Sequence, residues 1–243
     1  MSLISIKDLS YHYADGTEAL KEISLDILEK QKVGIIGANG AGKSTLVNHI
    51  CGYHLPQHGS VSVNNINLSK TTADSIRKIV GVIFQNADDQ LFMTTVLEDV
   101  AFGLRNLGFS RDEAMSKART SLDCLGISHL AEKHPINLSQ GQKRYAAFAG
   151  VFVLNPMIII MDEPTSDLDP KSRRETIELI NKLEATHILV SHDLDFIWDT
   201  CDRVVVLSNG TITADGNTRE ILSNENLLKE NGLELPLRLM RDN

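Results

Sequence analysis

The feature that most constrains this chain is a glycine-rich segment that follows a short apolar run and precedes a helix-like run. It reads GANGAGKS and matches the pattern G-x-x-x-x-G-K-[ST]. Glycines allow a tight turn in which successive backbone N–H groups point at one phosphate, and the N-terminus of a following helix adds the positive end of its dipole. The pattern predicts a phosphate loop formed by Gly37, Ala38, Asn39, Gly40, Ala41, Gly42, Lys43 and Ser44.

Two side chains of this loop can take part in chemistry. Lys43 is placed to contact the β- and γ-phosphates of a nucleotide, and the Ser44 hydroxyl can ligate Mg²⁺. A glycine-rich turn without a ligand is the structural alternative. The strand-like run at 32–37 and the helix-like run at 43–55 favour the phosphate loop.

A second motif is the apolar run at 157–161, which ends in Asp162 and Glu163. Burial of a strand explains its isoleucines but not two adjacent carboxylates, which cost free energy in a core unless they have partners. An exposed strand end is the alternative explanation. Together with the phosphate loop, the pair indicates a site in which Asp162 holds Mg²⁺ and Glu163 polarises the attacking water as general base.

The order of strand-like and helix-like runs predicts one α/β domain that spans residues 1–243. A nucleotide-binding core is expected over 1–85 and 151–216, with β-like runs at its N-terminus. Helical periodicity predicts a helical lobe over 86–150, where Ser110 and Glu113 form a helix-capping pattern. A polar C-terminal tail is expected over 217–243.

Composition narrows the classes of partner. The formal charge of −8 disfavours nucleic acid, because a phosphate backbone is bound by basic surfaces. No run approaches the roughly 18 apolar residues that span a bilayer, and no signal peptide is evident. The three cysteines show no metal-ligand pattern and are expected to be buried, reduced thiols of a cytosolic protein. Three neighbouring histidines are expected to be solvated rather than to bind a metal: His49, His54 and His58.

Further motifs give the chain a family resemblance, which extends from Tyr13 to about Gly216. The run LSQGQ at 138–142 resembles the signature of the ABC ATPase family, and DEPTSDLD at 162–169 resembles its catalytic strand and the following loop. The resemblance implies a P-loop NTPase fold, in which an ABC ATPase core carries an N-terminal antiparallel β lobe and an inserted α-helical lobe.

The resemblance also implies roles for single residues. Gln85, Asp167 and His192 fall where the family has its lid glutamine, its dimer-contact aspartate and its switch histidine. Tyr13, or alternatively Tyr11, would stack on adenine. The implied catalytic residues are Glu163, His192, Gln85 and Lys43. The implied Mg²⁺ ligands are Ser44, Gln85 and Asp162. The implied ATP-binding residues are those of the phosphate loop with Tyr13, Thr45, Ser139, Gly141 and Gln142.

Two subunits of such a family meet head to tail, so each would supply the phosphate loop for one ATP and the signature for the other. Ser139, Gly141 and Gln142 would contact the partner's nucleotide. Gln140 stands where the signature commonly has glycine. A side chain there is expected to alter nucleotide affinity or dimer closure rather than to abolish them. The partner would be a second copy or a close paralogue.

A narrower resemblance concerns the runs QNADDQLF at 85–92 and TVLEDVAFGL at 95–104. They look like the ATPases of energy-coupling-factor (ECF) importers, which take up vitamins and cobalt or nickel. The tail at 231–237 looks most like the cobalt/nickel branch. The implied function is an ATP-hydrolysing subunit that binds integral membrane subunits, and no nucleic acid, on the cytoplasmic side of the cell membrane.

Two other functions are weighed against this one. A soluble ABC ATPase of the DNA-repair or translation type would usually carry long coiled-coil insertions or tandem cassettes. A regulatory nucleotide-binding module without turnover would not need both Glu163 and His192.

The segment after Gln85 is predicted to dock the membrane partner. Phe92 and Met93 would line a groove for a short cytoplasmic helix, while Asp88 and Asp89 would face its basic residues. The alternative is that these apolar side chains pack inside the helical lobe.

Overall fold

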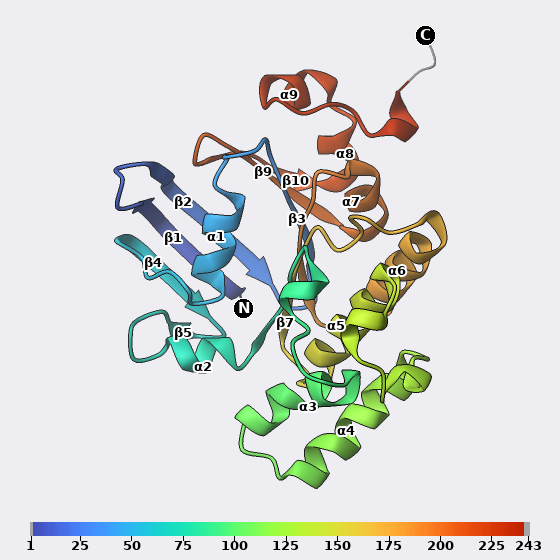
Figure 1. Ribbon diagram of the computed structural model, residues 1–243. Coiled ribbons are helices and arrows are strands. Elements are labelled where there is room, and N and C mark those ends of the chain that lie inside the picture. Colours follow the sequence, from blue (N-terminus) through green and yellow to red (C-terminus); the bar gives the residue numbers. More distant parts are fainter. Residues whose placement is uncertain (1, 241–243) are drawn as a thin grey trace.

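The computed structural model describes residues 2–240 and arranges them around two β-sheets (Figure 1). One sheet has the strand order β2-β1-β4-β5 and the other the order β10-β9-β3-β8-β7-β6. The helical lobe extends from the second sheet at the bottom of Figure 1, and the C-terminal segment lies at the opposite end of the molecule.

The smaller sheet follows in part from alternating sequence. In β2 (Glu18–Leu28) buried and exposed side chains alternate over the second half of the strand, whereas irregular register interrupts this alternation in β1 (Ser2–His12). Both strands pack buried side chains on the core. β4 (His58–Val63) pairs with β1, and β5 (Ile66–Asn67) pairs with β4. All of these pairings are antiparallel, which confirms the predicted N-terminal antiparallel β lobe.

The larger sheet is parallel over most of its width, and its parallel strands are largely buried, which explains why they are mostly continuous apolar runs. Only its last strand runs antiparallel to its neighbour. Because the parallel strands end at one edge, the segments that follow them come together there. The strands are β3 (Lys32–Ile36), β6 (Val80–Ile83), β7 (Ile158–Asp162), β8 (Thr186–Val190), β9 (Arg203–Ser208) and β10 (Thr211–Asn217).

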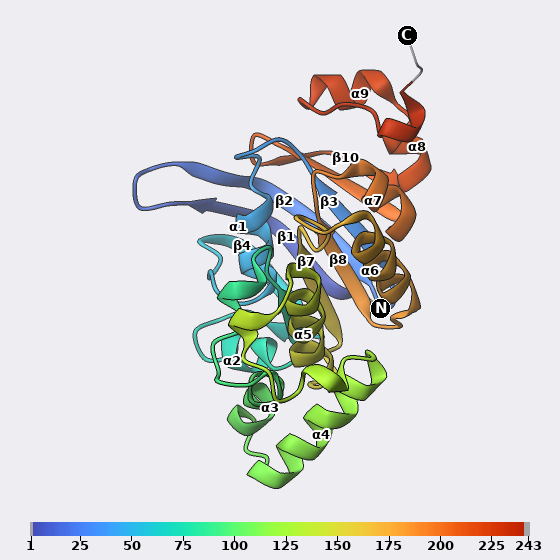
Figure 2. The same ribbon diagram turned by 45° about the vertical axis from the view of Figure 1, so that its right-hand side comes forward.

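Helices cover both faces of the larger sheet. α1 (Lys43–Ile50) packs into the core that the two sheets share. It ends before the predicted limit at residue 55, because Gly52 adopts a left-handed backbone with φ 73°. α6 (Pro170–Lys182) and α7 (Leu194–Thr200) lie on the opposite face (Figure 2). The short α2 (Ala73–Arg77) precedes β6.

The helical lobe has a hydrophobic core of its own. Its main helices are α3 (Val96–Asn106), α4 (Arg111–Cys124) and α5 (Gln140–Phe152). Ser110 caps α4 with its hydroxyl, and Glu113 completes the capping box, as the sequence predicted. Short 3-10 turns complete the lobe: η1 (Ala87–Asp89), η2 (Ser128–Leu130) and η3 (Pro135–Asn137).

The C-terminal segment is more structured than the polar tail that we expected. It forms α8 (Thr218–Leu222), α9 (Glu225–Glu230) and the turn η4 (Leu237–Leu239). A few apolar residues suffice for this, because each short helix buries only one side. The buried apolar residues of the two helices are Ile221, Leu222 and Leu228.

Two expectations from composition can be compared with the structure. Cys51 and Cys201 are buried free thiols, but Cys124 is exposed at the end of α4, so the expectation of buried cysteines is wrong there. Among residues 2–240, no helix has the length and apolar character that crossing a membrane requires.

Candidate active site

A cavity of about 400 Å³ lies at the edge of the larger sheet where its parallel strands end. The segments that line it are far apart in the sequence and come together only through the fold. They supply most of the site predicted for one chain: Tyr13, residues 39–44 of the phosphate loop, Thr45, Gln85, Asp162, Glu163 and His192.

The phosphate loop depends on two glycines that leave no room for a side chain. A Cβ atom on Gly37 would collide with the Leu207 carbonyl oxygen. A Cβ atom on Gly42, whose φ is 103°, would lie 2.6 Å from the Ala19 carbonyl oxygen. α1 begins directly after Gly42, so the N-terminal end of its dipole belongs to the same cavity.

Lys43 is buried at the start of α1, and its ammonium group bonds to its own loop. Its Nζ donates to the carbonyl oxygen of Gly37 at 2.7 Å and to that of Ala38 at 3.0 Å. Burial lowers the pKa of the ammonium group, while the charges of Glu163 and Asp162 act in the opposite direction. Both acceptors are neutral, so the oxygens of a phosphate would be stronger acceptors for this cation.

Asp162 stands at the end of β7 with its side chain in the cavity. Burial raises the pKa of its carboxyl group, and the neighbouring charge of Glu163 raises it further. A divalent cation would relieve both effects, and the carboxylate and the Ser44 hydroxyl are oxygen donors that suit Mg²⁺. No group of three or more histidine, cysteine, aspartate or glutamate side chains that could hold a metal ion occurs within residues 2–240. Mg²⁺ in nucleotide sites needs only one or two carboxylates, because phosphates and waters complete its ligands.

Glu163 follows with a left-handed backbone, φ 44°, which is uncommon outside glycine and is often found at functional sites. Its side chain is only 5% exposed. Oε2 accepts a hydrogen bond from Ser191 Oγ at 2.7 Å, and Oε1 accepts one from the His192 backbone N–H at 2.7 Å. The Nε2 atom of the exposed His192 ring lies 3.2 Å from Oε1.

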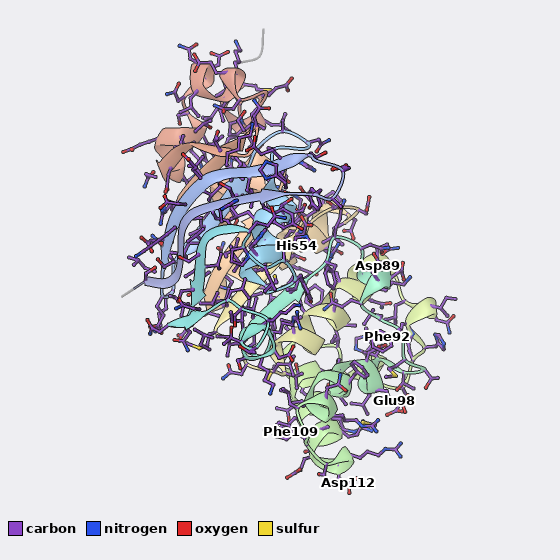
Figure 3. The ribbon with its side chains drawn as sticks, turned by 90° about the vertical axis from the view of Figure 1, so that its left-hand side faces the viewer. His54, Asp89, Phe92, Glu98, Phe109 and Asp112 are labelled. Atoms are coloured by element: carbon purple, nitrogen blue, oxygen red, sulfur yellow. The ribbon has the colours of Figure 1, made fainter. Side chains whose placement is uncertain are left out.

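The aromatic residues at the cavity mouth have distinct positions. Tyr13 lines the cavity, and its hydroxyl shares a 2.9 Å hydrogen bond with Thr45. Tyr11 instead stacks on His54 and packs against the shared core. His49 is fully buried and bonds to the Thr45 carbonyl at 2.8 Å, so the expectation that it is solvated is wrong. Figure 3 shows His54 on the face of the molecule that carries this cluster.

The predicted signature residues lie outside this cavity. Ser139 caps α5, accepting a hydrogen bond from the Gln142 N–H, and the Gln142 side chain accepts one from the Ser139 N–H. Gln140 lines a separate cavity of about 380 Å³, which Gln85 and Asp167 also line. One chain therefore does not bring Ser139, Gly141 and Gln142 to its own phosphate loop.

Several residues that sequence reasoning missed hold these groups in place. Ser191 binds Glu163, and its position directly before His192 was a signal that could have identified it. Arg173 on α6 forms a 2.7 Å ion pair with Asp193, the residue that caps α7. Lys143 and Arg144 on α5 bind the segment that follows β6. No local pattern marks these two cations, because charged residues in a helix are usually solvated.

Comparison with known proteins gives consistent matches. The family model described as "ABC transporter" matches residues 20–166. A protein of Geobacter sulfurreducens, named provisionally as an ABC transporter ATP-binding protein, is 44% identical, covering 97% of this chain and 94% of its own. The energy-coupling factor transporter ATP-binding protein EcfA of Carboxydothermus hydrogenoformans is 40% identical, covering 96% and 87%.

A solved structure agrees with these relatives. The chain superposes on CbiO1 from Clostridium perfringens, described as part of the ABC transporter complex CbiONQ, with a TM-score of 0.84 and 35% identity over 94% of both chains. The family model alone covers more than half of the sequence, and the relatives match along nearly all of it. This chain therefore belongs to the ABC transporter ATP-binding family, whose members are ATPases.

Proposed function

We propose that this ABC ATPase works in a dimer on the cytoplasmic side of a membrane and couples ATP hydrolysis to micronutrient uptake through integral membrane partners. The observation that carries the catalytic part is the cavity that joins the phosphate loop to Glu163. In it, a buried carboxylate held by two hydrogen bonds of 2.7 Å lies among groups suited to bind phosphates.

Each residue of the cavity has a chemical role in this proposal. The loop N–H groups and Lys43 bind the phosphates, and Tyr13 contacts the adenine at the mouth of the cavity. Ser44, Gln85 and Asp162 would hold Mg²⁺, which when bound neutralises phosphate charge. Glu163 orients the attacking water and accepts its proton, while His192 contacts the γ-phosphate.

The dimer follows from the position of the signature. Ser139, Gly141 and Gln142 stand at the N-terminus of α5, a helix of thirteen residues, and away from their own phosphate loop. A helix N-terminus favours anions, so a nucleotide held by a second ATPase subunit fits this position. The solved cassette MJ0796, 29% identical over 89% of this chain, is described as a dimer bound to ADP and Pi. Two copies of this chain, or this chain with a paralogue, would complete both sites.

The membrane partner is proposed to dock in an apolar groove between the helical lobe and the core. This groove has a volume of about 340 Å³, and its lining includes Tyr53, Phe84, Phe92 and Phe102. The Phe92 side chain is 62% exposed and meets Phe102 edge to face, with ring centroids 4.9 Å apart. A contiguous exposed apolar surface of this kind is typical of an interaction site.

The acidic residues around this groove differ from the expectation. Asp88 forms an ion pair with Lys143 within the chain, rather than being free to face a partner. Asp89 is exposed, but it lines the neighbouring cavity with Gln85 and Gln140 rather than the groove. Asp99, which also lines the groove, accepts hydrogen bonds from Phe92 N and Met93 N, but its Oδ2 atom has no partner among the described residues. Asp99 is thus the one acidic residue among those described as lining the groove, and it is buried, so the apolar side chains carry the docking proposal.

The cargo class rests on the relatives. The EcfA protein of Methanothermobacter thermautotrophicus is 41% identical over 96% of this chain. This likeness supports an ECF-type importer of a vitamin or of cobalt or nickel, and the tail at 231–237 favours the metal ions. A soluble ABC ATPase engaged in DNA repair or translation is the alternative. Co-purification with an integral membrane protein would support the importer, and its failure would favour the alternative.

The catalytic proposal is tested by replacing Glu163 with glutamine. The change keeps the shape of the side chain but removes its basicity, so kcat should fall by about 10²–10⁴-fold. ATP binding should persist, and the dimer should accumulate with ATP bound. Lys43→Ala is the comparison variant, because it should lose nucleotide affinity as well as hydrolysis. Turnover of Glu163→Gln within about threefold of the unmodified protein would contradict the role of Glu163 as general base.

A further inference from the structure

Two cations near the start of α5 hold the segment that carries Gln85. The Arg144 guanidinium donates from Nη1 to the Phe84 carbonyl oxygen and from Nη2 to the Gln85 carbonyl oxygen, both at 2.6 Å. The preceding residue, Lys143, donates from Nζ to Asp88 Oδ1, also at 2.6 Å. We call this set of contacts the α5 clasp.

Both cations of the α5 clasp are interior groups. Arg144 is 4% exposed and Lys143 is 8% exposed, whereas such residues normally remain solvated. Burial lowers the pKa of the Arg144 guanidinium, and the charge of Asp167 opposes this effect. The Nε atom has no hydrogen-bond partner among residues 2–240. A buried charge that bonds only to neutral carbonyls is a costly way to stabilise a fold, so stability alone does not explain it.

The planar shape of the guanidinium group explains how Arg144 can hold the backbone at Gln85. Its planar fork fixes two acceptors at once, which a lysine ammonium cannot do in the same way. Here the two acceptors are consecutive backbone carbonyls, so the fork sets the direction of the chain at Gln85. Gln85 lines the catalytic cavity, and Arg144 and Gln85 both line the neighbouring cavity with Gln140.

The α5 clasp therefore connects the signature helix with Gln85, two elements that have separate roles in the proposed ATPase cycle. Arg144 lies little more than one helical turn from Ser139, the residue that caps α5 and begins the signature helix. The N-terminus of α5 would face the nucleotide of the partner subunit, while Arg144 holds the glutamine that serves the nucleotide of its own chain.

We propose that Arg144 is a positioning residue for ATP hydrolysis that acts through Gln85, and that Lys143 supports it by holding Asp88. The inference rests on the proposed function, since the roles of Gln85 and of the signature come from there. When the helical lobe moves, α5 carries Gln85 with it. Closure of the dimer around the partner's nucleotide therefore places Gln85 at the nucleotide of its own chain.

The test is steady-state ATP hydrolysis by the full chain with Arg144→Lys, Gln85→Ala and both changes together. Arg144→Lys keeps the charge but removes the fork. It should lower kcat about 10-fold or more and change the KM for ATP less than about threefold, because a misplaced catalytic group costs rate rather than uniform binding. Arg119→Lys is the matched control. Arg119 pairs with Glu132 on the exposed surface of the same lobe, and its replacement should leave kcat within about twofold.

The double variant tests whether Arg144 acts through Gln85. In the Gln85→Ala background, Arg144→Lys should cost less than about threefold in kcat, because residues that act as one unit are not additive. Equal losses in both backgrounds would show a structural effect and overturn the proposal. It is also overturned by an Arg144→Lys or a Gln85→Ala variant that keeps the unmodified kcat.

The variant Asp88→Asn tests the same proposal if Arg144→Lys fails to fold. Asp88→Asn weakens the ion pair with Lys143 and leaves Arg144 in place. It should lower kcat by about threefold in the presence of Gln85 and have no effect in the Gln85→Ala background. The same loss in both backgrounds would overturn the proposal. Absence of ATP hydrolysis by the unmodified protein would instead refute the proposed function, which keeps the two failures distinct.

Discussion

The Ser191 hydroxyl donates a 2.7 Å hydrogen bond to Oε2 of Glu163, and both side chains are buried. Ser191 Oγ also accepts a hydrogen bond from the Asp193 N–H at 3.1 Å, so its single proton is directed at the carboxylate. The His192 N–H binds the other carboxylate oxygen. The proposed general base is thus held by the segment that follows the adjacent strand β8.

Removing this contact should affect the rate more than the binding of ATP. Ser191→Ala leaves Glu163 Oε2 with only the long 3.5 Å hydrogen bond from Ser166 Oγ, and we expect kcat to fall about 10-fold with KM nearly unchanged. Ser191→Thr retains the hydroxyl and should keep at least half of the activity. Steady-state kinetics of both variants check this. Equal activity of the alanine and threonine variants would show that the hydrogen bond does not position Glu163.

Much of the fold could be predicted because its strands are either alternating or continuous apolar runs. β1 and β2 form in the N-terminal region where β-like runs were expected, and the capping box of Ser110 marked the start of α4 correctly. The element boundaries that were predicted wrongly depend on backbone geometry or on packing against distant parts of the chain. The left-handed Gly52 ends α1 early, and the C-terminal helices place Ile221, Leu222 and Leu228 in a core that distant parts of the chain form.

The site residues could be predicted where the functional side chains are close together in the sequence. The phosphate loop and the acidic pair contain their own signal, so Lys43 and Glu163 were identified and lie in one cavity. Arg144 could not be identified in this way, since its partners are backbone carbonyls about sixty residues earlier. Backbone carbonyls occur at every position, and the sequence does not show which of them a side chain will reach.

The proposed two-subunit site predicts a specific defect for Ser139→Arg. The change places bulk and charge at the N-terminus of α5, where the partner's γ-phosphate is expected. ATP-driven dimerisation should fail, while the affinity of the monomer for ATP should stay within about twofold because the phosphate loop is intact. Size-exclusion chromatography with and without ATP, in a Glu163→Gln background, measures this. A variant that still dimerises with ATP would place the partner's nucleotide elsewhere.

The stability of the protein should depend on pH through His187 in β8. The ring is fully buried, both ring nitrogens lack hydrogen-bond partners within the described residues, and burial, with the nearby Lys32 charge, lowers its pKa from 6.5 to about 4. Below pH 6.5 the unfolded chain binds a proton that the folded chain does not. This group's contribution to stability is therefore complete above pH 6.5 and decreases as the pH falls toward 4, by about 1.4 kcal/mol per pH unit.

Replacing His187 with leucine removes this proton and should flatten that part of the pH profile. Urea unfolding at pH 7, 6 and 5 should show that the stability difference between the unmodified protein and His187→Leu changes by about 1.4 kcal/mol per pH unit below 6.5, in favour of the variant. A difference that stays constant from pH 7 to pH 5 would mean that His187 keeps an ordinary pKa in the folded state.

The docking groove predicts that Phe92 serves assembly and not catalysis. Its ring is exposed, borders the apolar groove and lies away from the cavity that holds Lys43 and Glu163. Phe92→Ala should leave basal ATP hydrolysis within about twofold. It should weaken binding to the membrane partner by about 30-fold, the usual effect of truncating an aromatic anchor in an interface by about 2 kcal/mol.

The control for this experiment is Phe109→Ala, because Phe109 is also an exposed aromatic residue of the helical lobe but lies outside the residues that line the groove (Figure 3). Asp88 is not suitable for charge reversal, since a lysine there would face Lys143 and disturb the α5 clasp. Co-purification from detergent-solubilised membranes measures assembly, and transport per ATP hydrolysed measures coupling. If Phe92→Ala and Phe109→Ala assemble equally well, the membrane partner binds a different surface. If Phe92→Ala alone is lost from the complex while its ATPase activity persists, the groove is the surface that couples ATP hydrolysis to the membrane subunits.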